Sequence, residues 1–221
     1  MTLRAGSATT SRPSSHPASR REQLLAAADR VVQRDGPLAS MNAIAAEAGI
    51  TKPILYRHFG DKGGLYQQLA TRHIDELLTR LRDALVTRGG LEARTRATVD
   101  TYLAAIAERP GVYRFLVHRA LVEDAAVRGE VEGFVRRFGD ELAAGLRLEP
   151  ALGGVGPARA AVWAHGIAGM VQAAGDWWLD QDEVAREVVV EELTALLLAG
   201  FAAAAPVAHP ARPRPGGDPR P

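Results

Sequence analysis

The sequence contains no cysteine among its 221 residues, and this absence removes several classes of protein. A disulfide framework, a thiolate zinc site and a cysteine nucleophile are all excluded, so a small secreted scaffold is ruled out and a cytoplasmic protein is expected. No apolar run approaches the roughly 18 residues of a membrane span, so we expect no membrane partner. The first 19 residues also lack the apolar stretch of a secretory signal.

The net charge is also small, at +1, which argues against a protein whose whole surface is covered in basic residues. The distribution of charge is uneven, however. Residues 1–62 hold nine Arg or Lys against five Asp or Glu, whereas residues 63–203 hold 15 against 20. Lysine is nearly absent, and both examples, Lys52 and Lys62, lie in the basic segment. This asymmetry indicates an N-terminal segment that faces a polyanion.

The two ends of the chain differ in composition from its body. Residues 1–19 are rich in Ser, Thr, Pro and Ala, and residues 205–221 are rich in Pro and Arg. Neither end can bury a core, so both are predicted to be disordered tails. Between them the apolar residues recur with helical spacing, and no segment shows the sustained alternation of a strand. The body is therefore predicted to be all-α.

Capping residues divide the first part of the body into three helices. Ser40 is the expected N-cap of the second helix, Gly49 ends it, and Thr51 is the expected N-cap of the third. Two short helices joined by so few residues have the geometry of a helix-turn-helix. Six longer helices separated by Gly and Pro follow. The nine predicted helices cover residues 20–34, 41–48, 52–58, 65–88, 91–109, 112–123, 125–148, 157–179 and 183–201.

The third helix and its flanks carry a dense set of hydrogen-bond donors. In a helix-turn-helix, the second short helix places its N-terminal part in the DNA major groove while its flanks contact phosphates. Hydroxyl, ammonium, phenol, guanidinium and imidazole groups occur together at Thr51, Lys52, Tyr56, Arg57, His58 and Lys62. The segment therefore indicates a DNA-contacting surface.

Residues 20–69 closely resemble the N-terminal domain of the tetracycline-repressor (TetR) family of bacterial regulators. The family pattern is Ile-Ala-x-x-Ala-Gly-Val, a Ser/Thr cap, and Leu-Tyr-x-His/Tyr-Phe followed by a Lys. The matching residues here are Ile44-Ala45, Ala48-Gly49-Ile50, Thr51, Leu55-Tyr56-Arg57-His58-Phe59 and Lys62. Two positions depart mildly from the pattern: Pro53, where many members carry a small residue, and Val32, where relatives often have Phe.

The resemblance implies a role for each matching polar residue. Ser40 and Thr51 would donate to phosphates, and Lys52 and Arg57 would contact base edges or nearby phosphates. The side chains of Tyr56, His58 and Lys62 would hold the DNA backbone. The implied DNA-binding residues are Ser40, Thr51, Lys52, Pro53, Tyr56, Arg57, His58 and Lys62. Each also has a plain structural interpretation, with Lys62 as a solvated surface residue and the aromatic side chains as core.

Beyond residue 70 the chain resembles the family only in architecture. The implied fold is all-α, with an N-terminal three-helix helix-turn-helix domain at residues 20–66 and a C-terminal six-helix ligand-binding and dimerisation bundle at residues 67–204. In the family the last two long helices pair with those of a second subunit. Small residues such as Gly166 and Gly169 suit close helix approach, although they can also fill the core of a monomer.

The bundle is expected to enclose an apolar site for a small molecule, since such sites lie between helices. Aromatic and polar residues are the candidates for its wall, although aromatic residues at helical spacing often belong to a plain core. The candidates are Tyr102, Phe115, His118, Arg119, Phe134, Trp163, His165, Asp176 and Trp177. A mainly hydrophobic effector is expected, with no metal and no cofactor.

Two other classes of function are weighed against a regulator. An enzyme is not expected, because the chain has no Gly-x-Ser-x-Gly, no Gly-rich phosphate loop and no His-Glu-x-x-His. A helical ligand-binding or adaptor protein, whose helix-turn-helix does not read DNA, is the remaining alternative.

The sequence therefore predicts a ligand-responsive transcriptional regulator, a repressor, that binds a near-palindromic double-stranded operator as a homodimer through its last two helices. Basic residues from Arg12 to Arg21 are a further hypothesis for contact with an adjacent minor groove.

Overall fold

The computed structural model describes residues 19–122, 125–181 and 183–204, apart from the side chains of residues 118–122. Within this part the chain forms nine α-helices and two short 3₁₀ helices, with no strand, so the predicted fold class is confirmed. The predicted tails lie outside the described residues, Ser19 excepted. The α-helices are α1 (Arg20–Asp35), α2 (Met41–Glu47), α3 (Lys52–Phe59), α4 (Lys62–Leu85), α5 (Gly90–Glu108), α6 (Pro110–Val122), α7 (Ala125–Leu148), α8 (Pro157–Trp178) and α9 (Arg186–Ala204), and the 3₁₀ helices are η1 (Gly36–Leu38) and η2 (Pro150–Leu152).

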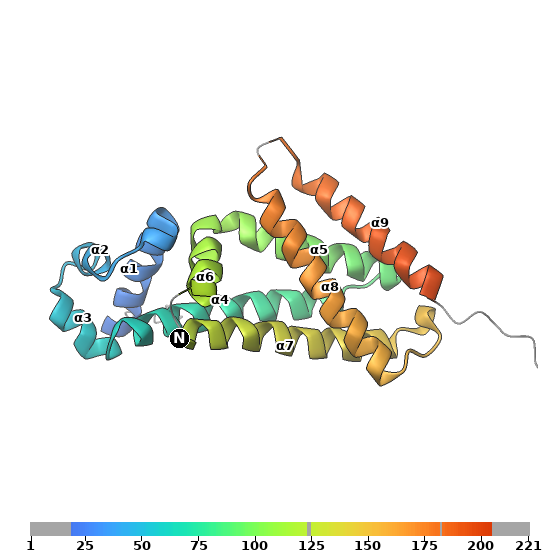
Figure 1. Ribbon diagram of the computed structural model, residues 1–221, viewed down its shortest axis with the longest axis horizontal. Helices are drawn as coiled ribbons and strands as arrows, with labels where there is room; N and C mark the ends of the chain where they lie inside the picture. Colours follow the sequence, from blue (N-terminus) through green and yellow to red (C-terminus); the bar gives the residue numbers. More distant parts are fainter. Residues whose placement is uncertain (1–18, 123–124, 182, 205–221) are drawn as a thin grey trace, which may run out of the picture.

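Helices α1 to α3 gather at one end of the molecule (Figure 1). Helix α1 begins with a capping box, in which the Ser19 hydroxyl accepts from the backbone of Glu22 and the Glu22 carboxylate accepts from that of Ser19. Its apolar stripe is fully buried and packs with residues of the next two helices, such as Ile44 and Leu55. A small hydrophobic core therefore holds the two short helices in place.

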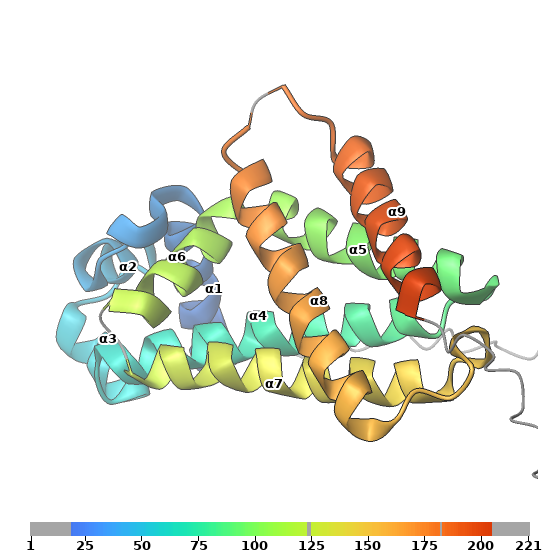
Figure 2. The same ribbon diagram turned by 45° about the vertical axis from the view of Figure 1, so that its right-hand side comes forward.

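Helix α4 joins this end to the rest of the molecule. It runs from α3 along the bundle beside α7, as both ribbon views show (Figures 1 and 2). The Tyr66 hydroxyl donates to the Ala39 carbonyl oxygen at 3.1 Å, and the Tyr66 ring meets the edge of Phe115 on α6 with centroids 4.9 Å apart. One buried side chain thus links the loop before α2 with the bundle.

The remaining helices form the bundle around α4. Helices α5 and α7 pack on α4, α8 crosses α7, and α9 packs on α5 (Figure 2). Helix α6 packs against α7 of the bundle and also against η1 and α1. The buried residues form one continuous cluster from α1 to α9, so the two parts share a core. None of the helices in the described ranges is long and apolar enough to cross a membrane.

Four helix starts differ from the sequence expectation, those of α4 and α9 by three residues each, that of α6 by two and that of α5 by one. Helix α4 begins at Lys62 rather than residue 65, because the Asp61 carboxylate accepts from the Gly64 amide at 2.7 Å and draws both glycines into the first turn. Helix α9 begins at Arg186, three residues later than expected, and continues to Ala204.

Candidate DNA-binding surface and internal cavity

The turn between α2 and α3 presents the start of α3 on the outside of the molecule. Gly49 has φ +65° and Gly60, which ends α3, has φ +85°, values that favour glycine. Leu55 is fully buried and fixes α3 against the core. The short helix therefore lies between two tight turns, with one face fixed against the core.

The outer face of α3 carries most of the predicted DNA-contacting groups. Lys52, Pro53 and Arg57 are exposed, while Tyr56 and His58 are half-buried. The Lys52 ammonium lies 5.7 Å from the centroid of the Tyr56 ring, a cation–π contact that orients both side chains. Ammonium, phenol and guanidinium groups thus stand together on one short helix.

Exposed groups from neighbouring elements flank this face. Thr51 is the N-cap residue of α3, as the sequence predicts, although its hydroxyl makes no capping hydrogen bond. Ser40 does cap α2, with its hydroxyl accepting from the Ala43 amide at 3.2 Å. Lys62 opens α4, and its ammonium lies 5.5 Å from the Tyr66 ring centroid.

The acidic residues near this surface are engaged elsewhere. The Glu47 carboxylate of α2 accepts from the Arg30 guanidinium at 2.7 Å, and that of Asp61 caps α4. Arg21, which the sequence assigned only to a basic run near the tail, lies over the Phe59 ring at 5.3 Å and donates to Gln68 at 3.0 Å. The surface consequently has a positive potential suited to phosphates.

A second feature is an elongated cavity of about 470 Å³ inside the bundle. Most of its wall is aliphatic, and it lies between α4, α5, α7 and α8, with contributions from α6 and α9. The wall extends from Ile74 on α4 to Val86, the residue that follows this helix, over roughly 18 Å at the helical rise of 1.5 Å per residue. The volume falls within the range of small-molecule sites.

The predicted pocket residues divide between the cavity wall and other places. Tyr102 and Phe134 line the cavity. Phe115 does not, because it is fully buried against Tyr66. Asp176 lies behind the wall, and the side chains of His118 and Arg119 lie outside the described residues.

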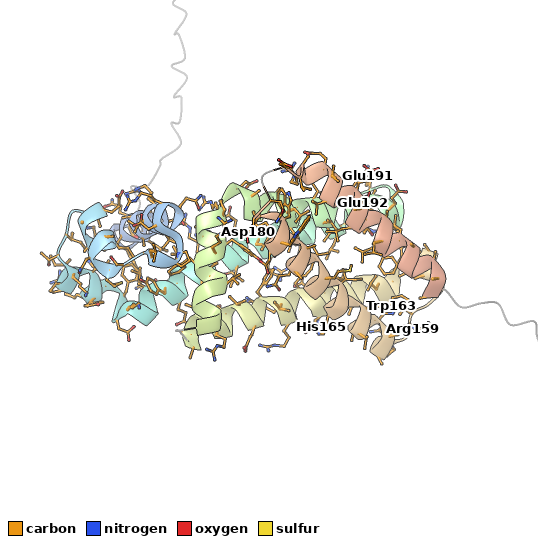
Figure 3. The ribbon with its side chains drawn as sticks, turned by 45° about the horizontal axis from the view of Figure 1, so that its top comes forward. Arg159, Trp163, His165, Asp180, Glu191 and Glu192 are labelled. Atoms are coloured by element: carbon orange, nitrogen blue, oxygen red, sulfur yellow. The ribbon has the colours of Figure 1, made fainter. Side chains whose placement is uncertain are left out.

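Three further candidates on α8 point away from the cavity. Trp163 packs on the Phe201 ring of α9 at 5.8 Å, and His165 is exposed beside Gly139 of α7 (Figure 3). Trp177 is 55% exposed. The expectation that these three residues line the cavity is therefore corrected.

Comparison with known proteins places both parts of the chain in one family. Residues 24–69 match the family model described as bacterial regulatory proteins, tetR family, and residues 80–212 match the tetracyclin repressor-like C-terminal domain. The chain belongs to the TetR family. The TetR family consists of DNA-binding transcriptional regulators, not enzymes.

Individual TetR-family relatives cover most of the chain. The HTH-type transcriptional activator FasR of Mycolicibacterium smegmatis is 33% identical over 164 residues, which are 74% of each protein. An uncharacterised HTH-type transcriptional regulator of Mycobacterium tuberculosis is 29% identical over 183 residues, 82% of this chain and 76% of the relative. A TetR-family regulator from Streptomyces coelicolor has the same fold, with a TM-score of 0.68, 24% identity, and coverage of 85% and 84% of the two chains.

The polar groups around the cavity of this TetR-family chain are mostly paired with one another. Arg94 forms a close ion pair with Glu149 at the end of the cavity far from α6. The hydroxyls of Thr95 and Thr98 donate to backbone carbonyls of their own helix, both at 2.8 Å. The Gln172 side chain also lines the cavity, and no hydrogen bond to it occurs among the described residues.

A hydrogen-bonded chain of three side chains lies at the opposite end. The Tyr102 and Tyr113 hydroxyls are 3.2 Å apart, and the Tyr113 hydroxyl donates to the Asp176 carboxylate. Burial raises the pKa of both phenols, so they keep their protons. Tyr113 was missed by sequence reasoning, although a tyrosine three residues into α6 was a detectable signal.

A third cluster joins α1 to the bundle. The Asp29 carboxylate of α1 is 2.6 Å from the His73 ring Nε2 on α4 and accepts from the Arg109 guanidinium, between α5 and α6, at 2.8 Å. Burial alone would raise the pKa of Asp29, but the hydrogen bonds and charges of its two partners outweigh this effect and lower it. We call these three residues the interdomain clasp.

The outer faces of α8 and α9 remain partly apolar. Val162 and Trp177 are 71% and 55% exposed on α8, and Val188 and Leu196 are 52% and 58% exposed on α9. Between the first two, Gly166, Gly169 and Ala173 are exposed on the same helix face. Other apolar residues of the same two helices are buried within the subunit itself, namely Ala164, Leu193, Leu197 and Phe201.

Proposed function

We propose that this DNA-binding regulator is a homodimeric repressor that reads a near-palindromic operator and releases it when a hydrophobic molecule enters the cavity. In this proposal α1 to α3 form the DNA-binding domain, and α4 to α9 form the ligand-binding and dimerisation domain. The observation that carries it is the outer face of α3, where Lys52 and Arg57 are exposed on a helix anchored by the core.

The proposed DNA contacts follow from the position of each group. Helix α3 enters the major groove, where Lys52 and Arg57 approach base edges or the adjoining phosphates. Ser40, Thr51 and Lys62 stand at helix starts, where side-chain donors and backbone amides together favour phosphate. Tyr56 and His58 complete the grip on the DNA backbone. Phosphate contacts supply most of the affinity and make it salt-dependent.

Dimerisation through α8 and α9 would place two such helices on one duplex. The apolar outer faces of these helices are unusual for surface helices, and the small residues of α8 permit close approach of a second copy. A two-fold dimer matches an operator made of two inverted half-sites.

The switch requires that the ligand favour one arrangement of the bundle over another. Such a ligand lowers DNA affinity, and DNA lowers ligand affinity by the same factor. The interdomain clasp connects α1 directly to α4 and to the start of α6. A shift of α4 or α6 would therefore move α1 and, with it, the short helices α2 and α3. Repression follows when the operator overlaps a promoter, whereas the relative FasR is named as an activator.

The proposal is tested by selecting bound sequences from random duplex DNA with purified protein near physiological salt. A palindrome with two half-sites supports the dimeric regulator. Weak binding that is sensitive to salt but not to sequence, from protein that mass spectrometry shows to carry no ligand, would instead favour a ligand-binding or adaptor protein that does not read DNA.

A pair of arginine variants then tests the assignment of α3. Arg57→Ala is expected to cost about 1–3 kcal/mol of binding to the selected duplex. Arg72→Ala is the matched control, because it removes an exposed arginine of α4 that lies about 15 Å from Lys62 along the axis of that helix. Its affinity for the duplex is expected to be unchanged. Equal losses in both variants would refute the specific role of α3.

A further inference from the structure

The two ends of the cavity differ in their polar groups, and the end beside α6 carries two tyrosine hydroxyls. The Tyr113 proton is committed to the Asp176 carboxylate, so the Tyr113 oxygen must accept in its contact with Tyr102. Both phenol protons are then used within the chain from Tyr102 to Tyr113 to Asp176. The two tyrosines therefore present oxygen lone pairs at this end, and neither phenol has a proton left to donate to a ligand.

The cavity also has no cation available for an acidic ligand. Arg94 is the one cationic side chain among the described residues of the wall, and it is already paired with Glu149, whose side chain is 9% exposed. At the other end, the Asp176 carboxylate lies directly behind the tyrosines and repels an anion. A buried carboxylate on the ligand would thus lose its hydration without gaining a cationic partner.

We propose that the cavity takes an elongated, uncharged apolar molecule with a terminal hydroxyl group, and that this hydroxyl donates to the Tyr102 oxygen. This assignment rests on the proposed function, because it names the chemical class of the effector. The aliphatic wall along α4 holds the chain over roughly 18 Å. A cationic end group is disfavoured because Asp176 is not itself part of the wall, so the charge would be buried without direct pairing.

The position of the hydroxyl-binding end also suits an effector. Tyr113 lies in the first turn of α6, close in sequence to Arg109 of the interdomain clasp. A donor placed on Tyr102 changes the hydrogen-bonded chain that ties α5, α6 and α8 together. Ligand chemistry at this end is therefore linked to the contact between the bundle and α1.

Three probes with the same alkyl chain test the proposal by binding alone. 1-Decanol can donate, 1-methoxydecane can only accept, and decanoate is anionic. Titration calorimetry with the full-length protein at pH 7.5 is expected to give a Kd for decanol about tenfold lower than for either of the others, the size of one well-placed hydrogen bond. Equal or tighter binding of decanoate or the ether, or no binding of decanol up to its solubility limit, overturns the proposal.

Two variants locate the selectivity within the cavity. Tyr102→Phe removes the accepting oxygen and is expected to abolish the preference for decanol over the ether. Thr98→Val is the matched control, because it removes a hydroxyl that lines the same wall but donates to the Arg94 carbonyl, and it keeps the preference. A preference that survives in Tyr102→Phe overturns the assignment.

Release of DNA is measured separately, with the selected operator and saturating decanol. If decanol binds with the expected selectivity but leaves operator affinity unchanged, the ligand class stands and the proposed switch fails for this molecule. If decanoate releases the operator and decanol does not, the switch stands and the ligand class is wrong.

Discussion

Replacing Gly111 with alanine tests how closely α6 packs on α1. A Cβ atom at this position would lie 2.1 Å from the Gln33 carbonyl oxygen and 2.8 Å from the carbonyl carbon. Ordinary contacts between non-bonded heavy atoms are about 3.5–4.0 Å, so the two backbones must separate by more than about 1 Å. Because the obstacle is backbone, no side chain can rotate to relieve the clash.

The expected cost follows from the size of this displacement. Overpacking that forces the backbone to move destabilises by about 1–3 kcal/mol. For a domain of this size, that loss lowers Tm by roughly 2–12 °C. The displacement of α6 also loosens its contact with α1 and η1, through which the bundle reaches the DNA-binding helices. Ligand is therefore expected to change the operator affinity of this variant less than that of the wild type.

Thermal unfolding at equal protein concentration measures the first effect, and operator titrations with and without ligand measure the second. Gly129→Ala is the control, because its Cβ meets nothing within 4 Å on α7 and alanine favours a helix by up to about 1 kcal/mol. A Gly111→Ala protein as stable as the wild type would refute the close backbone contact.

Three further predictions concern the other features. Lys62→Ala is expected to weaken binding to all duplexes alike and to reduce the slope of log affinity against log salt by about one, as fluorescence anisotropy at several salt concentrations would show. Gly169→Arg is expected to give folded monomers by sedimentation, since its Cβ meets nothing within 4 Å in the subunit, and persistent dimers would contradict the proposed interface. For Asp29 the folded pKa is lowered, so its carboxylate stabilises the fold above its ordinary pKa of 3.8, and this stabilisation is lost as pH falls through the lowered value. Asp29→Asn should therefore lower Tm at pH 7 and lose that difference in strong acid, whereas an equal difference at both pH values would contradict the clasp.

The helix-turn-helix was predictable because its determinants are local. Ser40 caps the helix that follows it, and Gly49 adopts the left-handed conformation that its turn requires. The all-α class followed in the same way from the spacing of apolar residues. Thr51 is likewise the N-cap residue that the sequence predicts, although its hydroxyl makes no capping hydrogen bond.

The cavity was much less predictable, because its wall combines side chains from helices far apart in sequence. Aromatic residues seemed the natural wall, yet Phe115 is buried against Tyr66 and Trp177 points outward. Most of the wall is aliphatic, and nothing in the local sequence shows whether a leucine on a helix will line a cavity or pack in the core. The clasp formed by Asp29 was equally hidden, since its two partners are 44 and 80 residues away.

The central claim is that two copies of α3 read one operator, and comparing a full palindrome with a single half-site tests it most directly. Sedimentation of the protein with each selected duplex gives the stoichiometry, and a titration near physiological salt gives the affinity. The account predicts two protomers on the palindrome and binding to the half-site at least tenfold weaker. One protomer on each duplex, with equal affinity for both, would contradict it.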